Sequence, residues 1–160
     1  MGKHLVLVGG GDADMVTLAN LYAFIEKGHK VTVTGPSAHH YYSGMGPGML
    51  GKTYAPDQIR FATQQVVQKQ GGTFILGSTT HIDPQEKIVF LESGDSIPYD
   101  VLSFNAGSYV PRTIISGSPG DIFTVKPIEK LIEAQKRIVE LVSQKKISVG
   151  IVGGGPSAAE

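Results

Sequence analysis

The sequence of 160 residues contains no cysteine and no excess charge of either sign. Without a thiol, these residues cannot build a disulfide framework, a zinc–thiolate site or a redox-active cysteine pair. The 14 Lys and Arg residues are matched by 14 Asp and Glu residues, so the formal net charge is zero. A protein that binds nucleic acid or an anionic membrane usually carries a basic face, and we therefore expect no nucleic-acid partner.

Long apolar runs are also missing. No stretch reaches the roughly 18 apolar residues that identify a membrane-spanning helix. The first apolar run, Leu5–Val8, leads straight into Gly9–Gly11 and is too short for the hydrophobic region of a secretory signal. We therefore expect a cytoplasmic protein.

Glycine, in contrast, is abundant, with 21 of the 160 residues, about 13% against a usual figure of roughly 7%. Two glycine clusters stand out because each directly follows an apolar run of strand type. The first is Gly9–Gly11 after Leu5–Val8, and the second is Gly153–Gly155 after Ile147–Val152. Strands that are apolar throughout are typical of a parallel sheet that is buried on both faces.

The remaining pattern predicts an α/β fold with a parallel sheet and a small antiparallel β meander. Apolar runs predict strands, helical spacing predicts helices, and closely spaced turn residues predict the meander. Besides the two runs above, the expected elements are sheet strands at 31–34, 73–76 and 101–104, helices at 13–27, 56–69 and 128–142, and meander strands at 79–82, 87–91 and 96–98. Residues 35–55 are expected to form an irregular loop.

Gly9 and Gly11 occupy a strand–turn–helix context that suits a nucleotide phosphate. In the motif Gly-x-Gly-x-x-Gly, the first glycine allows the tight turn, the second lets a pyrophosphate approach, and the helix N-terminus supplies N–H groups. Asp14 occupies the third position, where Gly or Ala is usual, and no acid follows the second strand near Gly35. Nucleotide binding is the favoured interpretation, and a plain structural turn is the alternative.

The second cluster fits the same motif fully, through Gly153, Gly155 and Ala158. Two such motifs in one chain point to two dinucleotides. The sequence ends at Glu160, where the helix after the second motif would begin. We therefore expect this chain to be the N-terminal fragment of a longer protein.

Metal chemistry has weaker support. Asp12 and Asp14 resemble a metal-binding pair, but no further carboxylate follows at the spacing of a calcium loop. His39 and His40 are adjacent and cannot both face one metal from an extended strand, so we expect them to be solvated loop residues. The sequence predicts no metal site.

Together, these motifs resemble the two-dinucleotide-binding-domain flavoproteins, also called the pyridine nucleotide-disulfide oxidoreductase superfamily. The resemblance covers the whole chain and rests on the order of the segments Val8–Gly11, Ile97–Leu102, Asn105–Ser108 and Ile151–Glu160. A closer likeness to the branch that contains type II NADH dehydrogenases is carried by Pro36–Ser37, Tyr42–Met45, Pro47–Gly48 and Val125–Ile128. The fold implied is a Rossmann-like FAD-binding domain.

The resemblance also implies two cofactors, FAD and NAD(P)H, and the residues that bind them. For FAD, the matching positions are Gly9, Gly11 and Asp12 at the pyrophosphate, Ser37 near the adenosine ribose, Thr79 with its backbone at the adenine, Ser43 and Gly44 by the flavin, and Ala106 and Gly107 beneath the cofactor. For NAD(P)H, they are Gly153, Gly155 and Ala158, with Glu160 as a candidate catalytic residue near the site of hydride transfer. The domains implied are the first part of an FAD-binding domain at 1–110, a connecting loop and helix at 111–146, and the start of a NAD(P)-binding domain at 147–160.

The activity implied is that of an FAD-dependent NAD(P)H oxidoreductase, which passes a hydride to the flavin and then electrons to a quinone or another small-molecule acceptor. The fragment alone is expected to be inactive, and a peripheral contact with the cytoplasmic face of a membrane would come from the missing C-terminal part. The alternatives are a flavoprotein similar to sulfide:quinone reductase and a non-catalytic nucleotide-binding regulatory module. The oligomeric state stays open.

Overall fold

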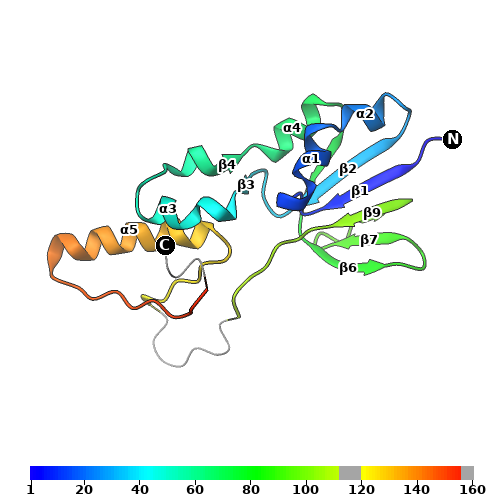
Figure 1. The fold of residues 1–160 in the computed structure, drawn as a ribbon. Helices are drawn as coiled ribbons and strands as arrows, with labels where there is room; N and C mark the ends of the chain where they lie inside the picture. The colour runs from blue at the N-terminus through cyan, green and yellow to red at the C-terminus, as the bar shows by residue number, and fades with distance from the viewer. Residues whose placement is uncertain (112–119, 156–160) are drawn as a thin grey trace. The chain divides into compact units, whose positions relative to one another are not determined.

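The computed structural model describes residues 1–111 and 120–155, and these residues pack into two compact units (Figure 1). Unit 1 comprises Met1–His40 and Phe61–Gly107. Unit 2 comprises Tyr41–Arg60 and the described chain that follows Gly107. Each unit has its own apolar core and is described separately.

Unit 1 is built on a parallel sheet of four strands in the order β5-β2-β1-β9. The strands are β1 (His4–Val8), β2 (Lys30–Gly35), β5 (Thr73–Leu76) and β9 (Val101–Phe104). β1 lies between two neighbours, with Leu5 opposite Val31 on one side and Val101 on the other. Residues 6–8 are buried, as expected for an apolar strand that is covered on both faces. The α/β fold with a parallel sheet is therefore confirmed.

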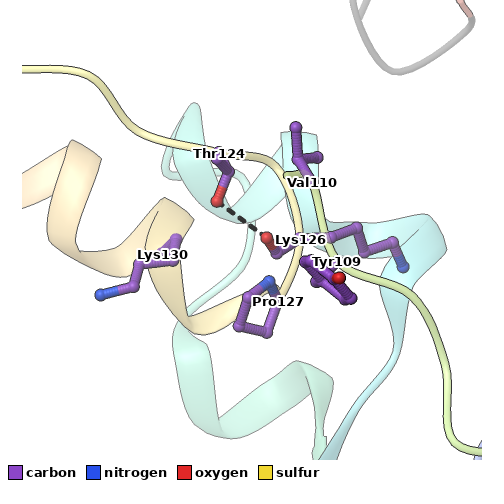
Figure 2. A pocket seen from close by; sticks show the side chains of 6 residues that line it. All are labelled: Tyr109, Val110, Thr124, Lys126, Pro127 and Lys130. Carbon is purple, nitrogen blue, oxygen red and sulfur yellow. Dashed lines mark hydrogen bonds between the residues drawn. The ribbon is translucent and has the colours of Figure 1, made fainter. Parts of the chain in front are cut away.

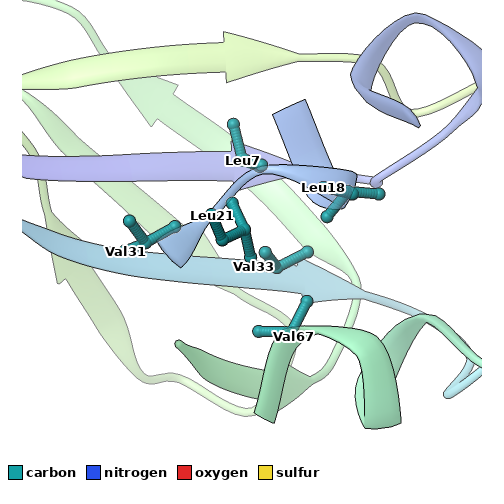
Figure 3. Close-up of a cluster of buried hydrophobic side chains, with 6 residues drawn as sticks. All are labelled: Leu7, Leu18, Leu21, Val31, Val33 and Val67. Carbon is teal, nitrogen blue, oxygen red and sulfur yellow. The ribbon is translucent and has the colours of Figure 1, made fainter. Parts of the chain in front are cut away.

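One face of this sheet packs against short helices. They are η1 (Asp12–Asp14), α1 (Met15–Ala19), α2 (Tyr22–Ile25) and α4 (Thr63–Lys69), of which η1 is a 3₁₀ helix. Figure 3 shows the buried cluster between sheet and helices, formed by Leu7, Leu18, Leu21, Val31, Val33 and Val67. This core holds β1 and β2 in place, and the loop that follows β1 starts from its edge.

The single helix expected over residues 13–27 is wrong, because one helix ends just before Asn20 and the next begins two residues later. The Asn20 Nδ2 donates to the carbonyl of Val16 at 2.8 Å. Its backbone N–H then bonds the carbonyl of Thr17 at 3.0 Å instead of continuing the helical pattern. An asparagine side chain that bonds nearby backbone competes with the helix in this way.

The expected meander is confirmed on the other face of the sheet. It consists of the antiparallel strands β6 (Thr79–Asp83), β7 (Ile88–Leu91) and β8 (Ser96–Pro98). Its side chains Val89, Leu91 and Ile97 form a second buried cluster with Val6 and Val8 of β1. Alternate residues of β1 therefore enter different cores, as the two-residue period of a strand requires.

Unit 2 contains α5 (Glu129–Gln144), the longest helix that the structure describes, with several short elements. These are η2 (Ser43–Met45), α3 (Gly46–Leu50) and η3 (Pro56–Ile59), and the paired strands β3 (His40–Tyr41) and β4 (Arg60–Phe61) stand where the chain passes between the units. Met49, Ile59, Ile128 and Leu131 form the buried core. The Gln135 Nε2 donates to the carbonyl of Met49, which ties α5 to the end of α3.

Two expectations about this region are wrong. The stretch 35–55 is not an irregular loop throughout, because α3 forms where Met49 is buried in the core and Pro47 suits the first turn of a helix. The helix expected over 56–69 is interrupted by β4. Ile59 is fully buried, and its carbonyl accepts a hydrogen bond from the backbone of Tyr42 at 2.9 Å, which holds the chain extended at this point.

The strand expected at 147–152 is also absent from the described structure. Val149, Ile151 and Val152 are exposed, although their sequence is that of a buried strand. A strand forms only where its backbone pairs with a neighbour. Among residues 1–111 and 120–155, no strand pairs with this segment.

Within the described part of the chain, no helix combines the length and the apolar character that crossing a bilayer requires.

The position of Leu7 at the centre of unit 1 predicts a large loss of stability on truncation. Leu7 is 1% exposed, whereas Val16 on α1 is 77% exposed. Leu7→Ala should lower the free energy of unfolding by about 2–5 kcal/mol, because it leaves a cavity in a packed core. Val16→Ala, the matched control, should change it by less than about 0.5 kcal/mol. Urea unfolding measures both, and equal losses would contradict this packing.

Candidate functional site

The candidate site lies in unit 1, where the carboxyl ends of β1 and β9 meet. The chain leaves β1 towards β2 on one side, while β9 pairs with the opposite side of β1. The sheet therefore extends from β1 in both directions, and the loops after β1 and β9 start from the same edge. In open parallel sheets, ligands bind at such a point, outside the carboxyl ends of the strands.

The loop after β1 is a tight turn that only glycine can form without strain. Gly9 has φ +101° and Gly10 has φ +60°, both in the left-handed region. The Gly9 N–H donates to the carbonyl of Thr34 at the end of β2, at 2.7 Å. A Cβ on Gly9 would stand 2.0 Å from the carbonyl oxygen of Asn105. The loops after β1 and β9 thus approach each other at a distance that excludes any side chain at Gly9.

Asn105 lies immediately after β9 and forms the second wall of the site. Its N–H donates to the carbonyl of Val8 at 2.8 Å, which extends the pairing of β9 with β1. Its side-chain Nδ2 is buried and has no hydrogen-bond partner. A Cβ on Gly11 would stand 2.9 Å from this nitrogen, so Nδ2 lies directly beside the glycine loop.

These features fit a phosphate-bearing cofactor. An unpaired buried donor costs about 1–3 kcal/mol, and a ligand oxygen placed beside the Gly9–Gly11 loop would remove that cost. Successive backbone N–H groups in a turn of this kind form a concave site for anions. The residues around the loop therefore fit the pyrophosphate that the sequence motif predicts, with Asn105 as an additional donor.

Asp14, the residue that departs from the motif, is explained by its surroundings. Its side chain is buried, and its Oδ1 accepts a hydrogen bond from the Ser103 hydroxyl of β9 at 2.7 Å. Its Oδ2 is buried and unpaired. The carboxylate is therefore directed at the sheet. Through this hydrogen bond, Asp14 connects the start of the helical segment to β9, at a position where the motif usually has a small residue that packs against the strand.

Asp12 is the other acid of the loop, and it contacts a histidine. The Nε2 of His40 lies 2.9 Å from Oδ1 of Asp12, and both side chains are partly exposed. The expectation that His40 is simply a solvated loop residue is wrong. No sequence signal indicates this contact, because the two residues are 28 positions apart and belong to different elements, η1 and β3.

Ser37 and Thr79 lie near the end of β2, next to the same edge. The N–H of Gly77 donates to the carbonyl of Gly35 at 2.9 Å. Ser37 lies two residues after Gly35, and Thr79 lies two residues after Gly77. The Ser37 hydroxyl accepts from the backbone of His39 at 3.1 Å. The Thr79 hydroxyl is buried and unpaired. Both positions are compatible with the ribose and adenine end of a dinucleotide.

The remaining candidate residues are distributed over both units. Ala106 and Gly107 are exposed in the loop after β9, directly beyond Asn105. The others described by the structure are Ser43 and Gly44 around η2 and Gly153 and Gly155 in an exposed segment, all in unit 2. Ala158 and Glu160 lie outside the described residues. The structure thus brings together Gly9, Gly11 and the turn that begins at Asn105.

Two residues of the site are missing from the sequence prediction, Asn105 and His40. Asn105 stands in a segment that carries the resemblance, and its position directly after an apolar strand could have indicated it. Its unpaired side chain and its approach to Gly9 are visible only in the folded chain.

Unit 2 contains a shallow pocket of about 380 Å³, shown in Figure 2. It is lined by Tyr109, Val110, Thr124, Lys126, Pro127 and Lys130, and the Thr124 hydroxyl donates to the carbonyl of Lys126 at 2.8 Å. The ammonium of Lys130 is paired with Glu133 at 2.7 Å. None of the candidate site residues lines this pocket.

Metal ligands are not gathered anywhere in the structure's described ranges. No group of three or more His, Asp or Glu side chains there could hold a metal ion.

The chain is similar to a known protein family and to several of its members. The family model described as pyridine nucleotide-disulphide oxidoreductase matches residues 3–160. The chain is 24% identical over 157 residues to sulfide-quinone reductase of Aquifex aeolicus (strain VF5), which covers 96% of the chain and 36% of that protein. It is 25% identical to human ferroptosis suppressor protein 1, with 98% of the chain and 39% of that protein covered.

Solved structures show the same fold. The sulfide:quinone oxidoreductase of Aquifex aeolicus matches with a TM-score of 0.72 and 23% identity, over 89% of the chain and 33% of that structure. NDH2 from Plasmodium falciparum, solved in complex with NADH, matches with a TM-score of 0.72 and 18% identity, over 92% of the chain and 31% of that structure. The chain thus spans less than two fifths of each of these relatives.

The close approach of Gly9 to Asn105 predicts that Gly9→Ala is strongly destabilising. Gly94, in a turn of the meander, is the matched control, because its φ is +91° and a Cβ there would meet nothing within 4 Å. Gly94→Ala should cost only the penalty of left-handed backbone, about 1–2 kcal/mol. Gly9→Ala must also separate two loops and should cost clearly more in urea unfolding. Equal costs would contradict the packing of these loops.

The contact between Ser103 and Asp14 predicts a rescue. Ser103→Ala should lower the free energy of unfolding by about 1–3 kcal/mol, because it leaves a buried carboxylate without a donor. The double variant Asp14→Ala, Ser103→Ala should recover most of this loss, since the buried carboxylate that had lost its donor is then removed as well. Thermal or urea unfolding of the three proteins tests this, and a double variant as unstable as Ser103→Ala would contradict it.

Proposed function

The chain belongs to the pyridine nucleotide-disulphide oxidoreductase family, and from this premise we propose that it is the N-terminal part of an FAD-dependent NAD(P)H oxidoreductase. The observation that carries the proposal is the glycine loop of β1, packed against the Asn105 turn at the switch point of the sheet. When bound, FAD would supply the redox chemistry, accepting a hydride from NAD(P)H and passing electrons to a quinone or another acceptor.

The residues of unit 1 have binding and orienting roles in this proposal. The N–H groups of Gly10 and Gly11 and the Nδ2 of Asn105 would hold the diphosphate, and Gly9, whose N–H is bonded to Thr34, would shape the turn beside it. Ser37 and Thr79 would face the adenosine end, and Ala106 and Gly107 would let the cofactor pass close to the backbone. In the second unit, Ser43 and Gly44 would lie beside the flavin. No described side chain is needed as a general acid or base.

The second nucleotide would be bound by the end of the chain. In this proposal, residues 1–110 are the first part of the FAD-binding domain, residues 111–146 connect it, and residues 147–160 begin the NAD(P)-binding domain. The exposure of Val149, Ile151 and Val152 supports this, because these apolar side chains suit a strand that pairs within a further sheet. Gly153, Gly155 and Ala158 would then bind NAD(P)H, and Glu160 would lie near the site of hydride transfer.

Acceptor binding would belong to parts of the protein beyond this chain. The names of the Aquifex relatives support a quinone as acceptor, since both are described as acting with sulfide and quinone. A peripheral contact with the cytoplasmic face of a membrane would also belong to those parts. We propose a cytoplasmic location for the domain described here.

A second candidate function is that of a sulfide:quinone reductase. Curated relatives with this description, from Aquifex aeolicus and Dictyostelium discoideum, support it. The absence of cysteine from these 160 residues does not favour it, because thiols would have to come from elsewhere in the protein. The two candidates share the FAD site and differ in the electron donor.

The visible absorption spectrum of the full-length protein tests the proposal. We expect a yellow protein whose long-wavelength flavin band bleaches when NADH or NADPH is added without oxygen. Dithionite is the control, because it reduces any bound flavin. A band that bleaches with sulfide but not with either nicotinamide nucleotide would favour the second candidate. A colourless protein that takes up no added FAD would contradict both and favour a non-catalytic module.

A further inference from the structure

The acidity of the glycine loop poses an electrostatic problem for an anion site. Asp12 directly follows Gly9–Gly11, so its carboxylate stands in the first turn after the loop. A diphosphate bound by the loop would face a negative charge at short range, and like charges in a partly buried site repel strongly. A site of this kind needs a compensating group.

The sequence supplies few such groups. Residues 5–26, which contain β1, the loop and the helices that follow, include no Lys, Arg or His. Between Ser37 and Gly51, the chain that leaves β2, the basic residues are His39 and His40. A compensating charge close to the loop therefore has to come from another segment.

His40 meets this need by its geometry. Its Nε2 lies 2.9 Å from Oδ1 of Asp12, with side-chain exposures of 25% for the histidine and 44% for the acid. An unprotonated nitrogen and a carboxylate oxygen would repel at this distance, so a proton lies between them. His39 has a different role, because its backbone N–H bonds the Ser37 hydroxyl.

We propose that His40 is the residue that makes this acidic glycine loop compatible with the diphosphate of FAD. Its Nε2–H donates to the Asp12 carboxylate and weakens the repulsion that this charge exerts on a bound diphosphate, so that the backbone N–H groups of Gly10 and Gly11 can bind the anion. His40 is a positioning and charge-compensating residue, and it takes no part in electron transfer. This inference rests on the proposed FAD site and assigns a specific role to a histidine within it.

The test is FAD binding to the full-length apoprotein, measured by flavin fluorescence. His40→Ala should raise the dissociation constant of FAD about tenfold, a loss of about 1.4 kcal/mol, because Asp12 then loses the histidine N–H that weakens its repulsion of the diphosphate. His39→Ala, the neighbouring residue of the same type, should change it less than about twofold. His40→Gln, which keeps a neutral donor, should lie between the wild type and His40→Ala.

A double variant separates charge compensation from a structural effect. If His40 acts by offsetting Asp12, then Asp12→Asn combined with His40→Ala should bind FAD within about twofold of Asp12→Asn alone. Added salt should also reduce the defect of His40→Ala, because it screens the exposed Asp12 charge. Thermal melting of each apoprotein shows that the variants are folded.

Other outcomes overturn the inference. An unchanged dissociation constant in His40→Ala would do so, as would a double variant that binds as weakly as His40→Ala. A wild-type protein that binds no FAD would overturn the proposed function and this inference together. Because tight binding by the wild type is measured first, failure of the His40 role is distinguishable from failure of the FAD site.

Discussion

The close contact between the loops after β1 and β9 is the constraint on which the site depends. Gly9 can lie against the carbonyl of Asn105 only because it has no side chain, and its left-handed φ is the conformation that glycine alone adopts freely. This contact brings the amides of the glycine loop beside the unpaired Nδ2 of Asn105. The two apolar clusters on either face of β1 fix the strand from which the glycine loop starts.

The two acids of the loop show how the fold can place negative charge near an anion site. Asp14 is directed into the protein, where a serine hydroxyl from β9 binds it. Asp12 remains partly exposed and is held by a histidine from the chain after β2. The first acid serves to join two elements of unit 1, whereas the second affects the charge that a ligand meets. The departures from the glycine motif therefore do not by themselves argue against a dinucleotide.

Much of the fold follows from local pattern, and the exceptions have physical reasons. The apolar run of β1 and the turn residues of the meander predict a parallel sheet with a small antiparallel sheet, as observed. The break at Asn20 depends on one side chain that competes for a helical carbonyl, and the interruption at Ile59 depends on burial in the core of unit 2. The glycine motif identifies the loop, but the contact of His40 with Asp12 joins positions 28 residues apart, and periodicity carries no information about it.

If the amides of Gly10 and Gly11 bind the diphosphate of FAD, they should exchange hydrogen more slowly when FAD is bound, and mass spectrometry measures this exchange. The full-length apoprotein would be compared with and without FAD. We expect slower exchange in the peptides that cover Gly9–Asp12 and Asn105–Gly107, and unchanged exchange in the meander turn at Gly94. Bound FAD that leaves the glycine loop unprotected, with protection confined to other segments, would contradict it.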